Sequence, residues 1–372
     1  MEPSYSHRFQ DLTVNSPGML EILREIKTTV ETGTLSEAAA KAQEALKLLK
    51  NTKLNIAITG ESGSGKSSFI NAMRGLKDDD EGAAKVDVTE ATMKPTPYPY
   101  PNHSNVTMWD LPGIGTLNFR SDTYLQQVKF TCYDFFIIVA SERFKCTHAE
   151  LAWEIQKMGK KFYFVRSKVD GDMENEKRKR NFNKEKTLEK IRDDCVQKLQ
   201  KEGVSSPQVF LVSRWNFSKY DGCKLQETLA DELDGHKKDV FLLALQNISR
   251  PILEKKKGAL EKEVWKRALL SCTIGAVPIP FLCIKCDVDI LVKSITEYYK
   301  AFGLGDNPLP LLAMYIEKPV PKVEATGISF VITYAMLQMF LDDVAEEAES
   351  VLTSALAADV KKSERLYIST TV

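Results

Sequence analysis

Residues 60 to 67 read Gly60-Glu61-Ser62-Gly63-Ser64-Gly65-Lys66-Ser67 and decide the fold of this chain, because they match the phosphate-binding pattern G-x-x-x-x-G-K-S/T. The apolar run 54–58 precedes them, and residues 68–74 have the composition of early helical turns. In this context backbone N–H groups converge on phosphate oxygens, Lys66 reaches the outer phosphates and Ser67 binds Mg²⁺. The alternative, a chance turn rich in glycine and serine, fits these flanks poorly. The predicted nucleotide contacts are Gly60, Glu61, Ser62, Gly63, Ser64, Gly65, Lys66, Ser67 and Ser68.

The charge balance of the chain argues against one class of partner. Lysine plus arginine and aspartate plus glutamate each number 51, so no basic excess points to nucleic acid. Seven cysteines are scattered through a sequence that starts without a basic and then apolar signal segment. We therefore predict a cytoplasmic protein with free thiols. The lone pair Cys283 and Cys286 is expected to pack in the interior, because zinc needs about four ligands.

Alternating patterns between residues 53 and 236 predict an α/β domain. Short apolar runs alternate with helical stretches, which implies a mostly parallel sheet with helices on both faces. The expected strands are residues 55–59, 106–109, 135–140, 161–165 and 209–212. The expected helices are residues 67–74, 122–131, 149–157, 184–202 and 224–234.

Both ends of the chain have helical periodicity instead. Apolar spacing predicts helices at residues 17–32, 34–49, 248–268, 288–302 and 328–341. We expect these N- and C-terminal segments to form an all-helical domain next to the phosphate-binding domain. The predicted division is an N-terminal helical segment over 1–50, a nucleotide-binding domain over 51–236 and a C-terminal helical domain over 237–372.

Two apolar segments bear on membrane contact. Residues 269–284 form an apolar run of 16 residues that includes Pro278 and Pro280, whereas a bilayer-spanning helix needs about 20 residues. A buried corner between helices is expected there. Residues 328–341 are apolar nearly all round, which predicts the centre of a helical bundle, with lipid contact as the alternative. Glu2 leads us to expect no N-terminal myristoyl group.

Two further motifs indicate which nucleotide the loop binds. Asp110-Leu111-Pro112-Gly113 follows an expected strand, where the aspartate can reach Mg²⁺ through water and the glycine N–H can meet the γ-phosphate. Ser167-Lys168-Val169-Asp170 also follows an expected strand and matches a relaxed N/T-K-x-D guanine reader. The Asp170 carboxylate accepts from guanine N1–H and N2–H₂, whereas adenine sets an acceptor against it. Ser213 follows the last expected strand, where a backbone N–H can meet guanine O6. The order of these elements predicts GTP and GDP as ligands.

A threonine that closes over the γ-phosphate and Mg²⁺ is expected between the loop helix and Asp110. Position alone does not choose among its candidates, which are Thr89, Thr92, Thr96 and Thr107. Ile114 follows Gly113 at the position where small GTPases carry a glutamine that orients the attacking water. Hydrolysis is therefore expected to be slow in the monomer or assisted by another group.

Several longer stretches resemble the interferon-inducible immunity-related GTPases. The resemblance rests on Gly60–Asn71, Trp109–Gly115, Tyr133–Ile138 and Phe162–Asp170, with weaker similarity from about residue 10 to 305. The Gly-Lys-Ser sequence at the loop is similar to the effector-type branch of this family. The resemblance implies a P-loop GTPase domain of α/β class joined to an all-helical domain.

The resemblance also implies roles for individual residues. Glu90-Ala91-Thr92-Met93 resembles the first switch, which makes Thr92 the Mg²⁺ ligand and Glu90 a candidate for assisting hydrolysis. Members of this family dimerise through their GTP domains in the GTP state. By resemblance Glu61 contacts the partner's ribose, and Arg143 and Lys145 lie at that interface.

The expected function is that of a dynamin-like GTPase of innate immunity. It hydrolyses GTP with Mg²⁺ and forms a homodimer, with Lys66, Glu90, Thr92 and Gly113 in catalysis. The ligands assigned to Mg²⁺ are Ser67, Thr92 and, through water, Asp110. The resemblance further implies peripheral association with intracellular or pathogen-containing membranes. The alternatives are a nucleotide-gated recruitment module with negligible turnover, and an ATPase.

Overall fold

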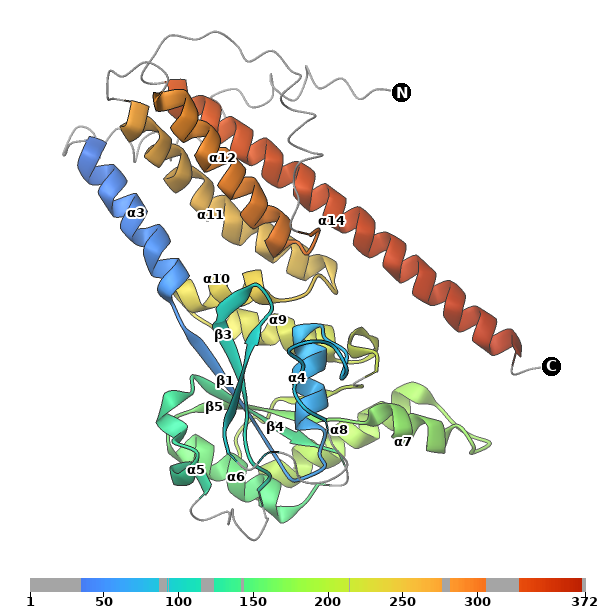
Figure 1. The fold of residues 1–372 in the computed structure, drawn as a ribbon. Coiled ribbons are helices and arrows are strands. Elements are labelled where there is room, and N and C mark those ends of the chain that lie inside the picture. The colour runs from blue at the N-terminus through green and yellow to red at the C-terminus, as the bar shows by residue number, and fades with distance from the viewer. Residues whose placement is uncertain are drawn as a thin grey trace. The chain divides into compact units, whose positions relative to one another are not determined.

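The protein divides into two compact units (Figure 1). The computed structural model describes residues 35–86, 92, 94–114, 124–141, 144–213, 215–275, 282–305 and 328–369. One unit is Thr52–Ile252, and the other is formed by the chain up to Asn51 together with the chain from Leu253 onward. The expectation that the two ends of the chain share a helical domain is therefore confirmed.

The strands of the first unit form one sheet in the order β2-β3-β1-β4-β5-β6. The strands are β1 (Leu54–Thr59), β2 (Thr96–Tyr100), β3 (His103–Asp110), β4 (Phe135–Ala140), β5 (Lys161–Arg166) and β6 (Val209–Leu211). Every neighbouring pair is parallel except β2 and β3, which are antiparallel. The expected mostly parallel sheet is confirmed, and β1, the strand that leads into the phosphate loop, lies inside it.

Helices cover both faces of this sheet (Figure 1). They are α4 (Lys66–Arg74), α5 (Tyr124–Gln127), α6 (Cys146–Lys157), α7 (Val169–Glu176), α8 (Lys184–Lys201), α9 (Gly222–Glu232) and α10 (Gly235–Ala244), with short 3₁₀ turns η1 (Phe130–Cys132) and η2 (Phe217–Lys219). Helices α4 and α10 contact β1 and β3, whereas α6 contacts β4 and β5. The unit is thus built in three layers.

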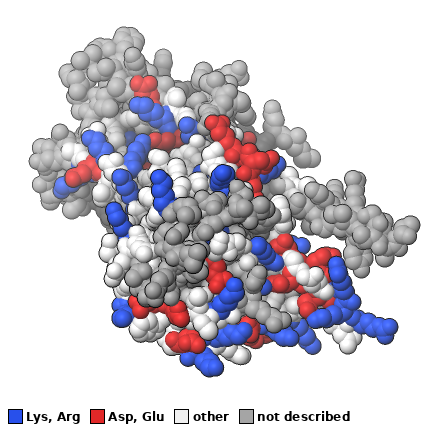
Figure 2. Space-filling view, turned by 60° about the horizontal axis from the view of Figure 1, so that its bottom comes forward, with Lys and Arg blue, Asp and Glu red and all other residues white. Residues whose placement is uncertain are grey.

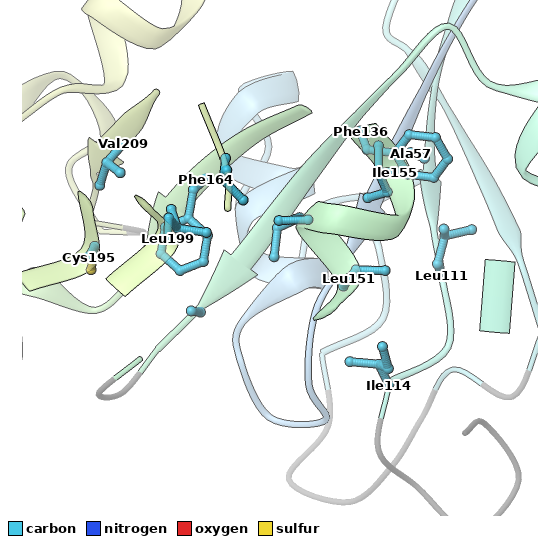
Figure 3. Packing of buried hydrophobic residues seen from close by; sticks show 14 of the residues in the cluster. Ala57, Leu111, Ile114, Phe136, Leu151, Ile155, Phe164, Cys195, Leu199 and Val209 are labelled. Carbon is cyan, nitrogen blue, oxygen red and sulfur yellow. The ribbon is translucent and has the colours of Figure 1, made fainter. Parts of the chain in front are cut away.

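The sequence of β4 shows why this sheet is buried on both faces. All of its residues are buried, and alternate ones, Phe136, Ile138 and Ala140, join a core cluster with Leu151 and Ile155 of α6 (Figure 3). Successive side chains of a strand point to opposite faces, so a strand without polar residues needs cover on each side. The carboxyl ends of these buried strands are the places where polar side chains emerge.

The structure differs from the sequence-based expectations at several elements. Strand β2 was not expected, because Pro97 and Pro99 interrupt it, and both prolines are accommodated at the sheet edge. Helix α7 was also not expected. The expected helix 122–131 is replaced by α5 and η1, with Lys129 at φ 54° between them. The sheet unit also extends past the expected boundary at residue 236, because α10 contacts β1 and β3.

The helical unit consists of α3 (Leu35–Asn51), α11 (Arg250–Gly275, from Leu253 on), α12 (Leu282–Ala301) and α14 (Ile328–Ser369) within the described ranges. Helix α14 runs well beyond the expected end at residue 341, because Val344, Ala348 and Leu352 continue its buried face at four-residue intervals. The helix expected at residues 17–32 lies outside the described residues. The corner expected at residues 269–284 lies outside them only over residues 276–281, because its two ends belong to α11 and α12.

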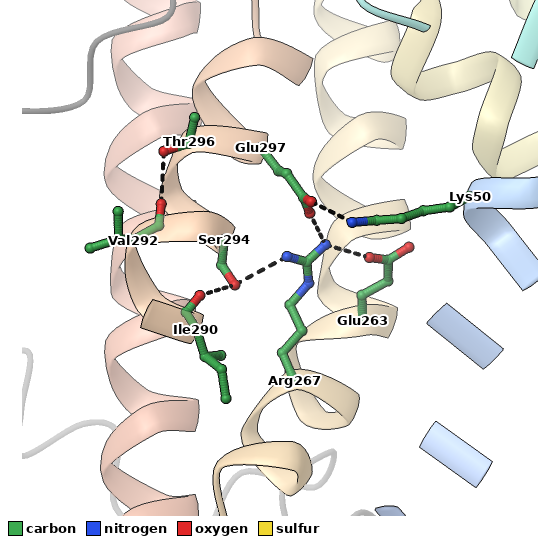
Figure 4. Close-up of polar contacts among 8 residues, drawn as sticks. All are labelled: Lys50, Glu263, Arg267, Ile290, Val292, Ser294, Thr296 and Glu297. Atoms are coloured by element: carbon green, nitrogen blue, oxygen red, sulfur yellow. Dashed lines mark hydrogen bonds and ion pairs between the residues drawn. The ribbon is translucent and has the colours of Figure 1, made fainter. Parts of the chain in front are cut away.

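A buried ion network joins helices from both ends of the chain in this unit. The Arg267 guanidinium donates to Glu263 at 2.9 Å, to Ser294 at 3.1 Å and to Glu297 (Figure 4). Lys50 of α3 donates to the other Glu297 oxygen at 2.7 Å. Burying a cation is costly unless its N–H groups are bonded, and these bonds offset that cost, although Arg267 Nε has no hydrogen-bond partner among the described residues. The network therefore links α11 to α12, and Lys50, whose side chain is exposed, adds a surface ion pair from α3.

On the face shown in Figure 2, neither positive nor negative charge dominates the surface. Lysine and arginine side chains lie among aspartate and glutamate side chains there, in keeping with the equal totals in the sequence. Within the described ranges, every helix is too short or too polar to span a bilayer.

Candidate functional site

The phosphate loop lies between β1 and α4 and needs glycine at two positions. Gly60 has φ 140°, and a Cβ there would lie 2.1 Å from the Val139 carbonyl oxygen. Gly65 has φ 89° and caps α4, whose first residue is Lys66. Side chains rarely adopt such φ values, so glycine is required. The free N–H groups at the start of α4 then point into the loop, where they favour an anion.

Lys66 is folded over this loop. Its ammonium donates to the carbonyl oxygens of Glu61 at 2.9 Å and of Gly60 at 3.3 Å, and its side chain is buried. An ammonium held against loop carbonyls is placed where the outer phosphates of a nucleotide would lie. The structure thus gives Lys66 the position that the motif predicts.

Three oxygen-bearing side chains converge next to the loop at the end of β3. Asp110 pairs in register with Ile58 of β1, which places its carboxylate beside the loop. Asp110 Oδ2 accepts from the Ser67 hydroxyl at 2.6 Å and from the Thr92 hydroxyl at 3.1 Å. Two hydroxyls and one carboxylate form a donor set of the hard oxygen type that Mg²⁺ prefers.

The state of Asp110 itself fits a cation site. Its Oδ1 atom is buried and has no hydrogen-bond partner among the described residues. Burial raises the pKa of this carboxyl above its usual range, although Ser67, Lys66 and Thr92 act in the opposite direction. A buried carboxylate with an unpaired oxygen is costly unless a positive charge meets it. Mg²⁺, which binds proteins through one or two carboxylates plus nucleotide phosphates, meets that need. No group of three or more His, Cys, Asp or Glu in the described ranges offers a different metal centre.

Among the threonine candidates, the structure brings Thr92 to this carboxylate. Thr96 instead donates to the Lys94 carbonyl at 3.0 Å, and Thr107 lies within β3 opposite Asn55. Thr89 lies outside the described residues. Glu90, the candidate for assisting hydrolysis, also lies outside them.

Gly113 lies directly against the phosphate loop. A Cβ at Gly113 would lie 2.8 Å from the Ser62 nitrogen, so any side chain there would force the two segments apart. The next residue, Ile114, donates its N–H to the Gly60 carbonyl at 3.1 Å and forms a bridge with Glu61. The Asp110–Gly113 segment is therefore in place to meet a nucleotide held by the loop.

The predicted guanine reader braces the loop from its other side. Ser167 donates its hydroxyl to the Ser64 carbonyl at 2.7 Å, and the Lys168 ammonium donates to the Gly63 carbonyl at 3.0 Å. Lys168 has φ 58°, which turns the chain sharply from β5 into α7. Asp170 lies in the first turn of α7, and its buried Oδ1 has no partner among the described residues. This oxygen is available to a ligand donor.

A hollow at this point contains most of the predicted base-contacting residues. It is lined by Gly65, Phe69, Ala72, Ser167, Lys168, Val212, Ser213 and Phe217. Ser213 is buried, and its hydroxyl accepts from the backbone N–H groups of Trp215 at 3.2 Å and Asn216 at 3.4 Å, which fixes the turn that follows β6. The hollow brings Ser167, Lys168 and Ser213 together beside the phosphate loop, whereas Asp170 does not line it.

Glu61, the predicted dimer contact, is held within its own chain. Its carboxylate accepts from Lys145 at 2.6 Å and from the Thr147 hydroxyl at 2.8 Å. Burial opposes ionisation, but the hydrogen bonds from Lys145 and Thr147 outweigh it and lower the pKa of Glu61. Glu61 is therefore a carboxylate that ties the phosphate loop to the start of α6. Arg143, the other predicted interface residue, lies outside the described residues.

Sequence reasoning did not find Phe217, Thr147 or Arg166, although each contacts the site. Phe217 forms a wall of the hollow, and Thr147 binds Glu61. Arg166 comes directly before the guanine reader and is buried. A cation at the end of an apolar strand was the one available signal for Arg166. The other two are common residues in irregular segments and carry no pattern.

Comparison with known proteins gives the family. The family model of interferon-inducible GTPases (IIGP) matches residues 19–339. Interferon-inducible GTPase 5 of Rattus norvegicus is 37% identical over 391 residues, covering 92% of this chain and 84% of that protein. Interferon-inducible GTPase 1 of Mus musculus is 40% identical over 307 residues, covering 82% and 74%.

Among solved structures, a GTP-binding protein from Sulfolobus solfataricus in complex with GDP is similar at 21% identity and a TM-score of 0.31, covering 52% of this chain and 55% of that one. The family match extends over most of the chain and includes every motif described above. This chain therefore belongs to the interferon-inducible GTPase family and is a GTP-binding GTPase.

Proposed function

We propose that this chain hydrolyses GTP with Mg²⁺ at the site formed by the phosphate loop, Asp110 and the guanine reader, and that two copies associate through this face in the GTP state. The observation that carries the proposal is the meeting of the Ser67 and Thr92 hydroxyls on the buried Asp110 carboxylate. This group lies beside the loop that holds Lys66.

We assign different roles in binding and hydrolysis to the residues of the site. Residues Gly60 to Ser68 hold the phosphates through N–H groups and the Lys66 ammonium, which offsets negative charge on the outer phosphates. Ser67 and Thr92 would hold Mg²⁺ directly and Asp110 through water, and the ion would neutralise charge on the β- and γ-phosphates. Gly113 would donate its N–H to the γ-phosphate, and Glu90 would assist hydrolysis. Ser167, Lys168, Asp170 and Ser213 would select guanine.

The proposed dimer accounts for the residue after Gly113. Ile114 cannot orient water, so a single molecule lacks the group that small GTPases use. Glu61 and Lys145 keep 21% and 49% of their side-chain surfaces exposed, so a second copy can reach the pair. We propose that Glu61, Arg143 and Lys145 contact the second copy and that the assembly orders the catalytic groups.

The proposed setting of this activity is innate immunity at intracellular membranes. It is supported by the family, whose members are named as interferon-inducible. We propose that the protein associates peripherally with intracellular or pathogen-containing membranes and that the hydrolysis cycle governs this association, as in dynamin-like GTPases.

Turnover per molecule, measured against protein concentration, tests the proposal. We expect phosphate release per molecule to rise with concentration and then to level off, because assembly completes the site. A Lys66→Ala variant, which lacks the phosphate-binding ammonium, serves as the control without nucleotide binding. A flat rate near zero, with GTP still bound, would instead identify a recruitment module. Release of phosphate from ATP at an equal rate would contradict the guanine assignment.

A further inference from the structure

Arg166 is a buried cation at the last position of β5, directly before the guanine reader. It is 6% exposed. Its guanidinium donates to the Ser167 carbonyl at 2.7 Å, to the Asp172 carboxylate at 2.7 Å and to the Ser141 carbonyl. A cation removed from water destabilises the fold unless its N–H groups find such partners. The groups that Arg166 bonds therefore indicate what this buried side chain does.

The three acceptors belong to three segments around the base site. Ser167 is the first residue of the reader, and its hydroxyl reaches the phosphate loop at Ser64. Asp172 lies two residues after Asp170 in the first turn of α7. Ser141 directly follows β4, whose last residue is in register with Arg166. One side chain thus connects the ends of two neighbouring strands to the helix that carries the base-reading carboxylate.

The geometry of arginine suits this task and that of lysine does not. The planar guanidinium presents N–H groups in a fixed fork, so it can bond two carbonyls and a carboxylate at once and set the distances between them. Asp172 and Asp170 share one helical turn, and bonding Asp172 to Arg166 leaves the Asp170 oxygen for a ligand. Without the fork, the first turn of α7 would lose the side-chain bond that connects Asp172 to β5.

We infer that Arg166 is a positioning residue for guanine selection: it holds Ser167 and the first turn of α7 so that the Asp170 carboxylate faces the base. Arg166 does not contact the nucleotide in this role. The inference rests on the proposed assignment of Ser167–Asp170 as the guanine reader, and the experiment separates the two.

The test compares GDP with inosine diphosphate, which lacks the N2 amino group that Asp170 accepts from. A hydrogen bond to a charged group contributes about 1.5–3 kcal/mol, so we expect wild type to prefer GDP by about 10- to 100-fold. In Arg166→Gln this ratio of dissociation constants should fall by about tenfold or more. Arg166→Lys should give an intermediate ratio, because lysine keeps the charge without the fork.

Arg74 supplies a matched control in the same unit. It is 7% exposed and donates to the carbonyls of Pro99 at 2.9 Å and Gly82 at 3.0 Å, far along the chain from the reader. Arg74→Gln should lower the melting temperature but leave the GDP to inosine diphosphate ratio unchanged. A purely structural role of Arg166 would make Arg166→Gln behave in the same way, which would overturn the inference.

Two further variants keep the outcome decisive. Asp170→Ala, which removes both acceptor oxygens, should abolish the preference for GDP, and if it does not, the reader assignment itself fails. If Asp170→Ala abolishes the preference and Arg166→Gln leaves it intact, only the role of Arg166 is refuted. Should Arg166→Gln not fold, Asp172→Ala decides, because Asp172 is partly exposed and carries one of the three bonds. A lowered ratio in that variant supports the inference, and an unchanged ratio overturns it.

Discussion

At the scale of single residues, Asp110 concentrates the chemistry of the site. One carboxylate oxygen receives two hydroxyls, while the other has no hydrogen-bond partner within the described ranges. Burial raises the pKa of this carboxyl, so the group gains from a cation more than an exposed aspartate would. A buried carboxylate with one oxygen that lacks a hydrogen-bond partner and with a raised pKa is typical of a functional site.

The hydroxyl of Thr92 provides the sharpest test at this scale. We expect Thr92→Ala to weaken Mg²⁺-dependent GTP binding by about 10- to 100-fold relative to GDP binding, because the lost ligand serves the γ-phosphate state. Calorimetric titration with GDP and a non-hydrolysable GTP analogue would measure both affinities. Thr96→Ala is the matched control, since the backbone of Thr96 is in register with Asp110 but its hydroxyl donates to the Lys94 carbonyl. Equal effects of the two substitutions would remove Thr92 from the metal site.

Residue patterns predicted much of this site, but not all of it. Lys66, Ser67, Asp110, Gly113, Ser167 and Lys168 follow from motifs, because phosphate and base recognition needs fixed residue types at fixed spacings. Spacing could not choose Thr92 among the threonines, since the choice depends on how a segment folds back on β3. Phe217 and Thr147 were missed for a related reason: their roles arise from tertiary contact alone.

At the scale of elements, the start of α6 organises the other side of the phosphate loop. The backbone N–H of Lys145 donates to His148 Nδ1 at 3.1 Å, which caps the helix, and the Lys145 ammonium bonds Glu61. His148 is buried between Phe144 and Phe164, and burial lowers its pKa despite the nearby Glu61. A neutral His148 can accept that N–H, whereas a charged one cannot. The helix thus presents Lys145 and Thr147 to the loop in a fixed arrangement.

Removing Lys145 tests whether this arrangement serves assembly. We expect Lys145→Ala to lower the concentration-dependent part of GTP turnover by about tenfold. The variant lacks a positive charge at the proposed interface, so the affinity between two copies should fall. GDP affinity should stay near the wild-type value. Lys157→Ala is the control on the same helix, where Lys157 lies over the Trp153 ring at the opposite end. Loss of GDP affinity in Lys145→Ala would show that Lys145 supports the loop alone.

Elements were predictable where one pattern dominated. The buried strands are continuous apolar runs and helices such as α8 and α9 have helical periodicity, and the structure confirms these elements with small shifts at their ends. Strand β2 escaped because proline argues against a strand except at an edge, and an edge is a property of the whole sheet. The length of α14 was underestimated because its buried positions after residue 341 are separated by acidic residues.

At the scale of the whole molecule, the helical unit contains a second buried cation. Lys256 of α11 is 1% exposed and donates to the Ala301 carbonyl at 2.6 Å at the end of α12. Burial lowers the pKa of Lys256 to about 7. The unfolded chain, with an ordinary lysine pKa, binds more protons than the folded chain between about pH 7 and pH 10. Stability attributable to Lys256 therefore rises with pH over that range.

The Lys256→Met variant tests this pH dependence of the free energy of unfolding. The free energy of unfolding should rise with pH by up to about 1.4 kcal/mol per pH unit through Lys256 in wild type, and Lys256→Met should lose that slope. Denaturant unfolding of the full chain at pH 7, 8 and 9, followed by circular dichroism, gives both slopes. Lys257→Met is the control, because its neighbour Lys257 is partly exposed and paired with Asp342 at 2.6 Å. Identical slopes in wild type and Lys256→Met would contradict the shifted pKa.

The two edges of the sheet bear on how copies of this protein can meet. Edge strand β2 contains Pro97 and Pro99, which have no N–H to offer, and the opposite edge, β6, spans only Val209–Leu211. Neither edge is a good template for another strand, so runaway polymerisation by sheet extension is disfavoured. The association proposed above, through side chains around the nucleotide, does not use these edges. In that proposed assembly the contacts would be lost when the γ-phosphate is released, so the association would be reversible in each hydrolysis cycle.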